Sequence, residues 1–239
     1  MSAPGSGGDA PDAKRRSPAA SATQPGMVDF DKYRRFGAYH WKLVETMPDY
    51  RQRVATVCGY IRPGMRCLDL GCGDGTYIYY VAQHGGRVTG VDGDADGIRC
   101  AGEELRRRDV PGFRLVHATF RNLGEHLRGE EGRFDFVYSM DCIEHLVDPA
   151  ELLDVVERFT ARRGTFLIGT PLFLGPELVS EYHVKEYTRE ELDALLDARF
   201  RKLGDHLLDA PVPGQKQLVP RFYCYHGRRR VPWWRFWGR

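Results

Sequence analysis

Short apolar runs alternate along this chain with longer segments in which apolar residues recur every three or four positions. The short runs predict β-strands and the periodic segments predict helices. Strands are expected at 66–70, 87–91, 113–117, 134–139, 165–170, 202–208 and 221–226, and helices at 75–84, 95–108, 121–128, 149–161 and 188–198. Strands and helices that alternate in this way favour a doubly wound α/β sheet with helices on both faces.

The pattern also divides the chain into four parts. Residues 1–26 are rich in Gly, Ala, Ser, Pro and Asp and contain almost no large apolar side chain, so we expect this segment to be disordered. Residues 27–62 are aromatic-rich and helical in pattern, and we expect a cap that covers a ligand site or packs on the sheet edge. Residues 63–227 hold the α/β domain, and residues 228–239 form a basic, aromatic tail.

A glycine cluster follows the first predicted strand. Asp69 ends that strand, and Gly71 and Gly73 allow the backbone to turn sharply and approach a ligand closely before the next helix begins. The second predicted strand ends at Asp92, where a carboxylate is placed to accept both hydroxyls of a ribose. A dinucleotide-binding turn is disfavoured, because Thr76 stands where that motif needs its third glycine. A turn without a ligand is the remaining interpretation.

With the fourth predicted strand, these signals make residues 50–226 resemble the class I S-adenosylmethionine-dependent methyltransferases. The resemblance implies a Rossmann-like, seven-stranded sheet with six parallel strands and one antiparallel strand. It also implies that Asp69 and the glycine turn hold the methionyl end of the cofactor, that Asp92 holds the ribose, and that Thr119 and Phe120 meet the adenine. The full set of expected cofactor residues is Asp69, Gly71, Cys72, Gly73, Asp92, Gly93, Thr119, Phe120 and Met140.

A second group of polar residues follows the fourth predicted strand. If this segment is helical, Asp141, Glu144 and His145 share one face, and His183 can join them from the loop after the fifth strand. Two carboxylates and two imidazoles suit a divalent metal such as Mg²⁺ or Mn²⁺. The group resembles the acid–histidine motif of ubiquinone-biosynthesis O-methyltransferases and of small-RNA 3′-end 2′-O-methyltransferases. The alternatives are that His145, with Glu144 and His183, supplies a metal-free catalytic base, or that these residues only order the loop.

Composition narrows the partners and the location. The net charge of +2 gives no sign of a nucleic-acid partner. The six cysteines do not have the spacing of a metal site, and several lie in apolar runs, so we expect reduced thiols. No segment has the pattern of a signal peptide or the length of a membrane span, and we therefore expect a cytoplasmic protein. The tail interleaves arginines with Trp233, Trp234, Phe236 and Trp237, which predicts weak contact with a membrane surface. A nucleic-acid surface, through stacking and phosphate contact, and a tail packed on its own domain are the alternatives.

The predicted function is therefore methyl transfer from S-adenosylmethionine to a hydroxyl group of a small molecule, such as a phenol, a sugar or a natural-product scaffold. A hydroxyl acceptor needs a base or a metal, and the acid–histidine group can supply either. An RNA 3′-end 2′-O-methyltransferase and a non-catalytic S-adenosylmethionine-binding module are the alternatives. The oligomeric state is left open.

Overall fold

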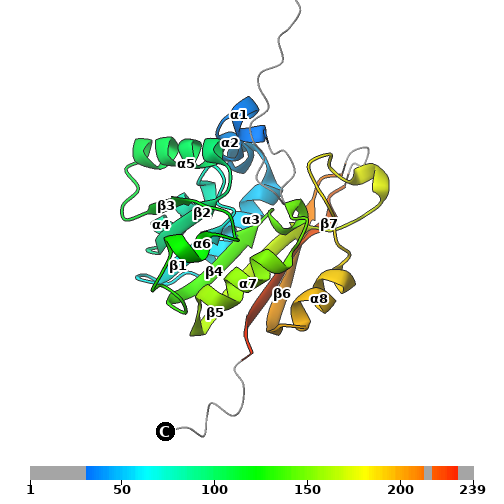
Figure 1. Ribbon diagram of the computed structural model, residues 1–239. Coiled ribbons are helices and arrows are strands. Elements are labelled where there is room, and N and C mark those ends of the chain that lie inside the picture. Colours follow the sequence, from blue (N-terminus) through cyan, green and yellow to red (C-terminus); the bar gives the residue numbers. More distant parts are fainter. Residues whose placement is uncertain (1–30, 213–216, 231–239) are drawn as a thin grey trace, which may run out of the picture.

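The seven strands form a single sheet in the computed structural model, which describes residues 31–212 and 217–230 (Figure 1). The strand order is β3-β2-β1-β4-β5-β7-β6. The strands are β1 (Arg66–Leu70), β2 (Arg87–Asp92), β3 (Arg114–His117), β4 (Phe134–Met140), β5 (Thr160–Pro171), β6 (Phe200–Ala210) and β7 (Val219–Arg229). The predicted strands are confirmed, and β5, β6 and β7 extend further than their apolar cores indicated.

Strand direction places the chemistry at one end of this sheet. Strand β7 runs antiparallel to both of its neighbours, β5 and β6, while the other pairs of adjacent strands are parallel. The expectation of six parallel strands and one antiparallel strand is therefore confirmed. Chain order reverses between β1 and β4, and ligands of such sheets bind beyond the carboxyl ends of the strands at that point.

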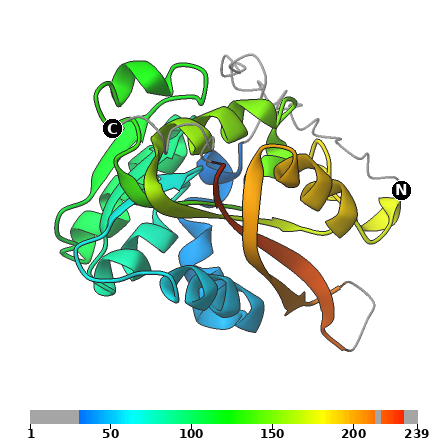
Figure 2. The same ribbon diagram turned by 90° about the horizontal axis from the view of Figure 1, so that it is seen from below.

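Helices cover both faces of the sheet (Figures 1 and 2). One hydrophobic core packs the sheet against α6 (Leu123–His126), α7 (Ala150–Phe159) and α8 (Arg189–Asp197). The other packs it mainly against α4 (Thr76–Gln83) and α5 (Ala95–Arg107). Helix α6 has only four residues, whereas the pattern predicted eight. None of the helices in the described ranges is long and apolar enough to cross a membrane, and all six cysteines are free thiols.

The described part of the predicted cap contains three helices, α1 (Lys32–Phe36), α2 (Tyr39–Thr46) and α3 (Pro48–Cys58). The helical pattern of the cap is interrupted at Gly37, whose φ of 62° ends α1. The indole Nε1 of Trp41 donates to the carbonyl of Asp74 at 3.0 Å. This bond fixes α2 to the glycine turn, so the cap lies over the carboxyl ends of the strands. The expectations for residues 1–26, and those for residues 231–239 of the tail, lie outside the described residues.

Candidate active site at the carboxyl ends of the strands

The glycine turn after β1 requires its glycines for two physical reasons. Gly71, Gly73 and Gly75 have φ angles of 80°, 51° and 79°, a region that side chains disfavour. A Cβ on Gly71 would also lie 2.7 Å from the sulfur of Cys142. The turn is held to β2, because the N–H groups of residue 71 and residue 72 donate to the carbonyl of Val91 at 2.8 and 2.9 Å.

Asp92 closes this turn from the tip of β2. Its Oδ2 accepts from the N–H of Gly73 at 2.7 Å, and its Oδ1 accepts from the N–H of Asp94 at 2.8 Å. Burial raises the pKa of Asp92 to about 6, although the two backbone hydrogen bonds oppose that shift. Each carboxylate oxygen has a second lone pair, so Asp92 is anchored by the backbone and can still accept from a ligand hydroxyl.

Two lobes make up the cleft above these strands. The larger has a volume of about 310 Å³ and the smaller about 70 Å³. Asp92, Gly93, Thr119 and Phe120 line the smaller lobe, and Cys72 and Met140 line the larger. The residues common to both lobes mark the junction between them: Tyr33, Gly71, Asp141 and His145.

Asp69 and Gly73 lie beside the lobes rather than on their walls. Asp69 is 1% exposed, and its Oδ2 has no hydrogen-bond partner among the described residues. Burial raises the pKa of Asp69 well above its usual value; the nearby hydroxyl of Tyr138 opposes this shift, and the carboxylates of Asp92 and Asp74 reinforce it. Gly73 is covered by Tyr33 from the cap, because a Cβ at this glycine would collide with the tyrosine hydroxyl.

The smaller lobe suits an adenosine group. It combines the Asp92 carboxylate, which can accept from vicinal hydroxyls, with the ring of Phe120 and the polar side chain of Thr119. Its volume is well below the roughly 300–1,000 Å³ of ligand pockets. Tyr33 stands between the lobes, so a displacement of α1 is the simplest way to enlarge the space.

Glu144 lies at the inner wall of the larger lobe. It is 1% exposed, Thr170 donates to its Oε2 at 2.8 Å, and its Oε1 has no hydrogen-bond partner among the described residues. Burial, reinforced by the nearby charge of Asp141, raises the pKa of Glu144 to about 8. The side chain thus presents an unsatisfied oxygen that a proton or a cation would satisfy.

His145 and His183 meet at the same wall with a ring separation of 4.9 Å. Nδ1 of His145 lies 2.7 Å from the carbonyl oxygen of Tyr182, which can only accept, so this nitrogen carries the proton and the basic lone pair is on Nε2. Burial lowers the pKa of His145 to about 4, which keeps its ring neutral near pH 7. Nδ1 of His183 lies 2.7 Å from the carboxylate of the buried Glu186.

The structure brings three of the four predicted metal ligands together. One ligand atom each from Glu144, His145 and His183 lies within 4.8 Å of the others. Nδ1 of each histidine lies within hydrogen-bond distance of an oxygen acceptor. In metal sites, a hydrogen bond of this kind orients the imidazole so that its other nitrogen faces the metal. The donor set therefore fits a divalent cation, with Glu144 as the only carboxylate of the group.

Asp141 is not in that group. The predicted helix is one turn of 3₁₀-helix, Ile143–His145, and Asp141 precedes it with a φ of 52°, a strained value for a residue with a side chain. Its Oδ1 accepts from Nη1 of Arg53 at 2.6 Å, and Nη2 of Arg53 donates to Asp49 at 3.0 Å. The ion pair turns the Asp141 carboxylate toward the cap. Asp141 and Glu144 therefore do not lie on one helical face, and the prediction of Asp141 as a fourth metal ligand is wrong.

Several residues of the cleft were missed by the sequence analysis. Asp74 lines the larger lobe, and it accepts from the N–H of His40 at 2.9 Å and from the hydroxyl of Thr76 at 2.8 Å. Its position between Gly73 and Gly75 of the glycine turn is a signal that could have indicated a place in the site. The others carry no motif, because they come from the cap, from α4 and from β7: Tyr33, Tyr50, Arg53, Tyr77, Arg221 and Phe222.

Known proteins share both the sequence pattern and the fold. Residues 68–168 match the family model of a methyltransferase domain. A ubiquinone biosynthesis O-methyltransferase of Caulobacter sp. (strain K31) is 33% identical over 109 residues, which is 45% of this chain and 41% of that protein. The chain thus matches less than half the length of the curated relatives.

Two solved structures share the fold at low sequence identity. A SAM dependent methyltransferase from Aquifex aeolicus has a TM-score of 0.61 and 16% identity, and covers 79% of this chain and 93% of its own. Magnesium protoporphyrin IX methyltransferase of Synechocystis PCC 6803 with bound SAH has a TM-score of 0.63 and 15% identity, and covers 84% of this chain and 97% of its own.

The strand order, the glycine turn with Asp92 and the family match define one class of protein. These features are those of the class I S-adenosylmethionine-dependent methyltransferases. The chain carries a methyltransferase domain of this class, as its sequence predicted.

Proposed function

We propose that the protein is an enzyme that transfers the methyl group of S-adenosylmethionine to a hydroxyl group of a small molecule. The observation that carries the proposal is the position of His145, which lies at the junction of the two lobes, where donor and acceptor would meet. Its neutral ring, with the lone pair on Nε2, can take the hydroxyl proton as the oxygen attacks the methyl carbon, the sulfur–methyl bond breaks and S-adenosylhomocysteine leaves.

The cleft contributes mainly by alignment. Asp92 and the glycine turn fix the donor on one side of the junction, and the larger lobe holds the acceptor on the other. Methyl transfer is an in-line displacement, so holding the acceptor oxygen close to the methyl carbon supplies a large part of the acceleration. The walls of the larger lobe, including the half-buried Tyr77 and the buried Phe222, exclude water from the reacting oxygen.

In a metal-dependent form of the reaction, Glu144, His145 and His183 would instead hold a divalent metal, and Nε2 of His145 would then be a ligand rather than the base. A cation bound there would lower the pKa of the acceptor hydroxyl as a Lewis acid. The unsatisfied Oε1 of Glu144 and the engaged Nδ1 atoms of both histidines support this ligand set. Arg53 withdraws Asp141 from it by neutralising the Asp141 carboxylate.

One set of measurements tests the proposal. Calorimetry should detect S-adenosylmethionine binding at about micromolar affinity, about −8 kcal/mol. A screen of phenols and sugars with isotope-labelled cofactor should then give a methyl ether. Chelation that abolishes turnover, with recovery on addition of Mg²⁺ or Mn²⁺, supports the metal; indifference to chelation assigns the proton transfer to His145 alone. Cofactor binding with labelled RNA ends as the only product would instead favour the 2′-O-methyltransferase alternative.

A further inference from the structure

Six arginines gather at the end of the sheet opposite the cleft. Because β7 is antiparallel to β5 and β6, its last residues lie beside the first residues of those strands: Arg201 pairs in register with Arg228, and Phe200 with Arg229. A hollow of about 790 Å³ opens between them. We call these residues the arginine surface: Arg162, Arg163, Arg201, Arg228, Arg229 and Arg230.

The charges of this surface are not matched by carboxylates. In the described ranges, none of the six guanidinium groups lies within 4.0 Å of a carboxylate oxygen, and Arg229 and Arg230 donate only to backbone carbonyls. The acid that lines the hollow, Asp197, accepts from the hydroxyl of Tyr225 at 2.6 Å. The basic side chain beside it, Lys202, is neutralised by two aspartates.

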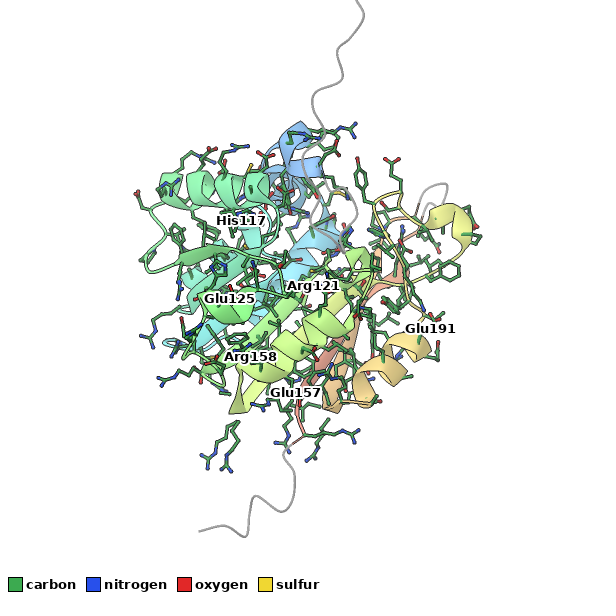
Figure 3. The ribbon with its side chains drawn as sticks, viewed as in Figure 1. His117, Arg121, Glu125, Glu157, Arg158 and Glu191 are labelled. Atoms are coloured by element: carbon green, nitrogen blue, oxygen red, sulfur yellow. The ribbon has the colours of Figure 1, made fainter. Side chains whose placement is uncertain are left out.

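Arginines elsewhere on the molecule are arranged differently. Arg121 and Arg158, labelled along the α6–α7 side of Figure 3, pair with Glu151 and Glu131 at 2.6 and 2.8 Å. The chain as a whole carries a net charge of only +2. Six unmatched cations on one end are therefore a local concentration of positive charge, which attracts a surface of closely spaced anions.

We propose that the arginine surface docks the protein on an anionic membrane. The chain passes directly from Arg230 into Val-Pro-Trp-Trp-Arg-Phe-Trp-Gly-Arg, a sequence that places four large aromatic residues and two further arginines next to this surface along the chain. Aromatic rings favour the headgroup level of a bilayer, and arginines favour its lipid phosphates. Charge and aromatic content at one point of the chain fit a lipid surface better than a nucleic acid.

The position of the surface fixes how the docked protein is oriented. The cleft lies at the carboxyl ends of β1, β2 and β4, and the arginine surface lies at the other end of the same sheet. Figure 1 shows the described end of β7 at the far end of the sheet from the cap helices α1 and α2. Docking therefore leaves the cleft open to the aqueous side, and the acceptor enters from there. An RNA bound to these arginines would likewise lie at the end away from the cleft, which argues against RNA as the methylated substrate.

The test is sedimentation of the full-length protein with vesicles. At low salt, it should sediment with phosphatidylcholine vesicles that contain phosphatidylglycerol, but not with phosphatidylcholine alone, and high salt should release it. The triple variant Arg162→Gln, Arg163→Gln, Arg201→Gln leaves β7 and the tail intact. Its vesicle partition coefficient should fall by about two orders of magnitude, or roughly fivefold for each arginine.

A second triple variant is the matched control. Arg99→Gln, Arg106→Gln and Arg107→Gln remove the same number of charges from the exposed face of α5, and vesicle binding should stay within about twofold of the wild type. Cofactor calorimetry on both variants checks that each is folded, independently of turnover. The proposal is wrong if the wild type never sediments, if the two triple variants lose binding equally, or if single-stranded RNA binds and vesicles do not.

Discussion

The two lobes of the cleft are built by different means. The smaller lobe consists almost entirely of residues at or a few positions beyond the ends of β1, β2, β3 and β4, and its one buried carboxylate, Asp92, is held by backbone N–H groups. The larger lobe draws side chains from the cap, from the turns after β1, β4 and β5, and from β7. Binding the donor thus depends on local backbone geometry, whereas binding the acceptor depends on side chains assembled from distant parts of the chain.

The ionic contacts of the larger lobe also join side chains from distant parts of the chain. At the larger lobe Arg53 joins Asp49 on its own helix to Asp141 at the tip of β4, and its guanidinium stacks on the rings of Tyr50 and Phe222, at 4.3 and 4.0 Å from their centroids. A change in the smaller lobe should therefore affect cofactor affinity, and one in the larger lobe should affect turnover or the stability of the cap. Four substitutions test this division.

Removal of the His145 imidazole should have the largest effect. His145→Ala should lower turnover by about two to four orders of magnitude, the usual contribution of a catalytic base, and leave cofactor affinity nearly unchanged. Turnover is measured with labelled cofactor and affinity by calorimetry. His126→Ala, at an exposed position on α6, is the control and should change neither. Unchanged turnover in His145→Ala would make this histidine a structural residue.

The buried ion pairs of the cap come next. Arg53→Met leaves the carboxylates of Asp49 and Asp141 without their partner and should cost about 3 kcal/mol of the free energy of unfolding. Denaturant unfolding measures the loss, and the added change Asp141→Asn should restore part of it. Arg51→Met, on the exposed side of the same helix, is the matched control. Equal stabilities of the two single variants would show that Arg53 does not hold the cap to β4.

The division between the lobes also explains what the sequence could predict. The strands, the glycine turn and Asp92 follow from apolar runs and residue spacing, because these features depend on neighbours in the chain. The pairing of Asp141 with Arg53 could not be found this way, because it joins residues 88 positions apart. The same limit applies to the arginine surface, whose members are brought together only by the antiparallel pairing of β7.

Loss of the Asp92 charge should weaken the cofactor. Asp92→Asn should lower S-adenosylmethionine affinity by about 10- to 100-fold, because hydrogen bonds to a charged acceptor contribute about 1.5–3 kcal/mol. Turnover at saturating cofactor should change far less, since the larger lobe is untouched. Calorimetry gives the affinity, and Asp96→Asn, on the first turn of α5, is the control. A variant that binds as tightly as the wild type would exclude Asp92 as the ribose acceptor.

Asp69 should give the smallest effect, although its motif was the strongest sequence signal. The carboxyl group lies beside the lobes, burial raises its pKa, and Asn has nearly the same shape. Asp69→Asn should therefore weaken S-adenosylmethionine by less than about 1 kcal/mol, or about fivefold, by the same calorimetry. A loss equal to that of Asp92→Asn would mean that cofactor binding exposes the Asp69 carboxylate to the amino group of the methionyl end. In that case Tyr33, which covers Gly73 next to it, would have to move when the cofactor enters.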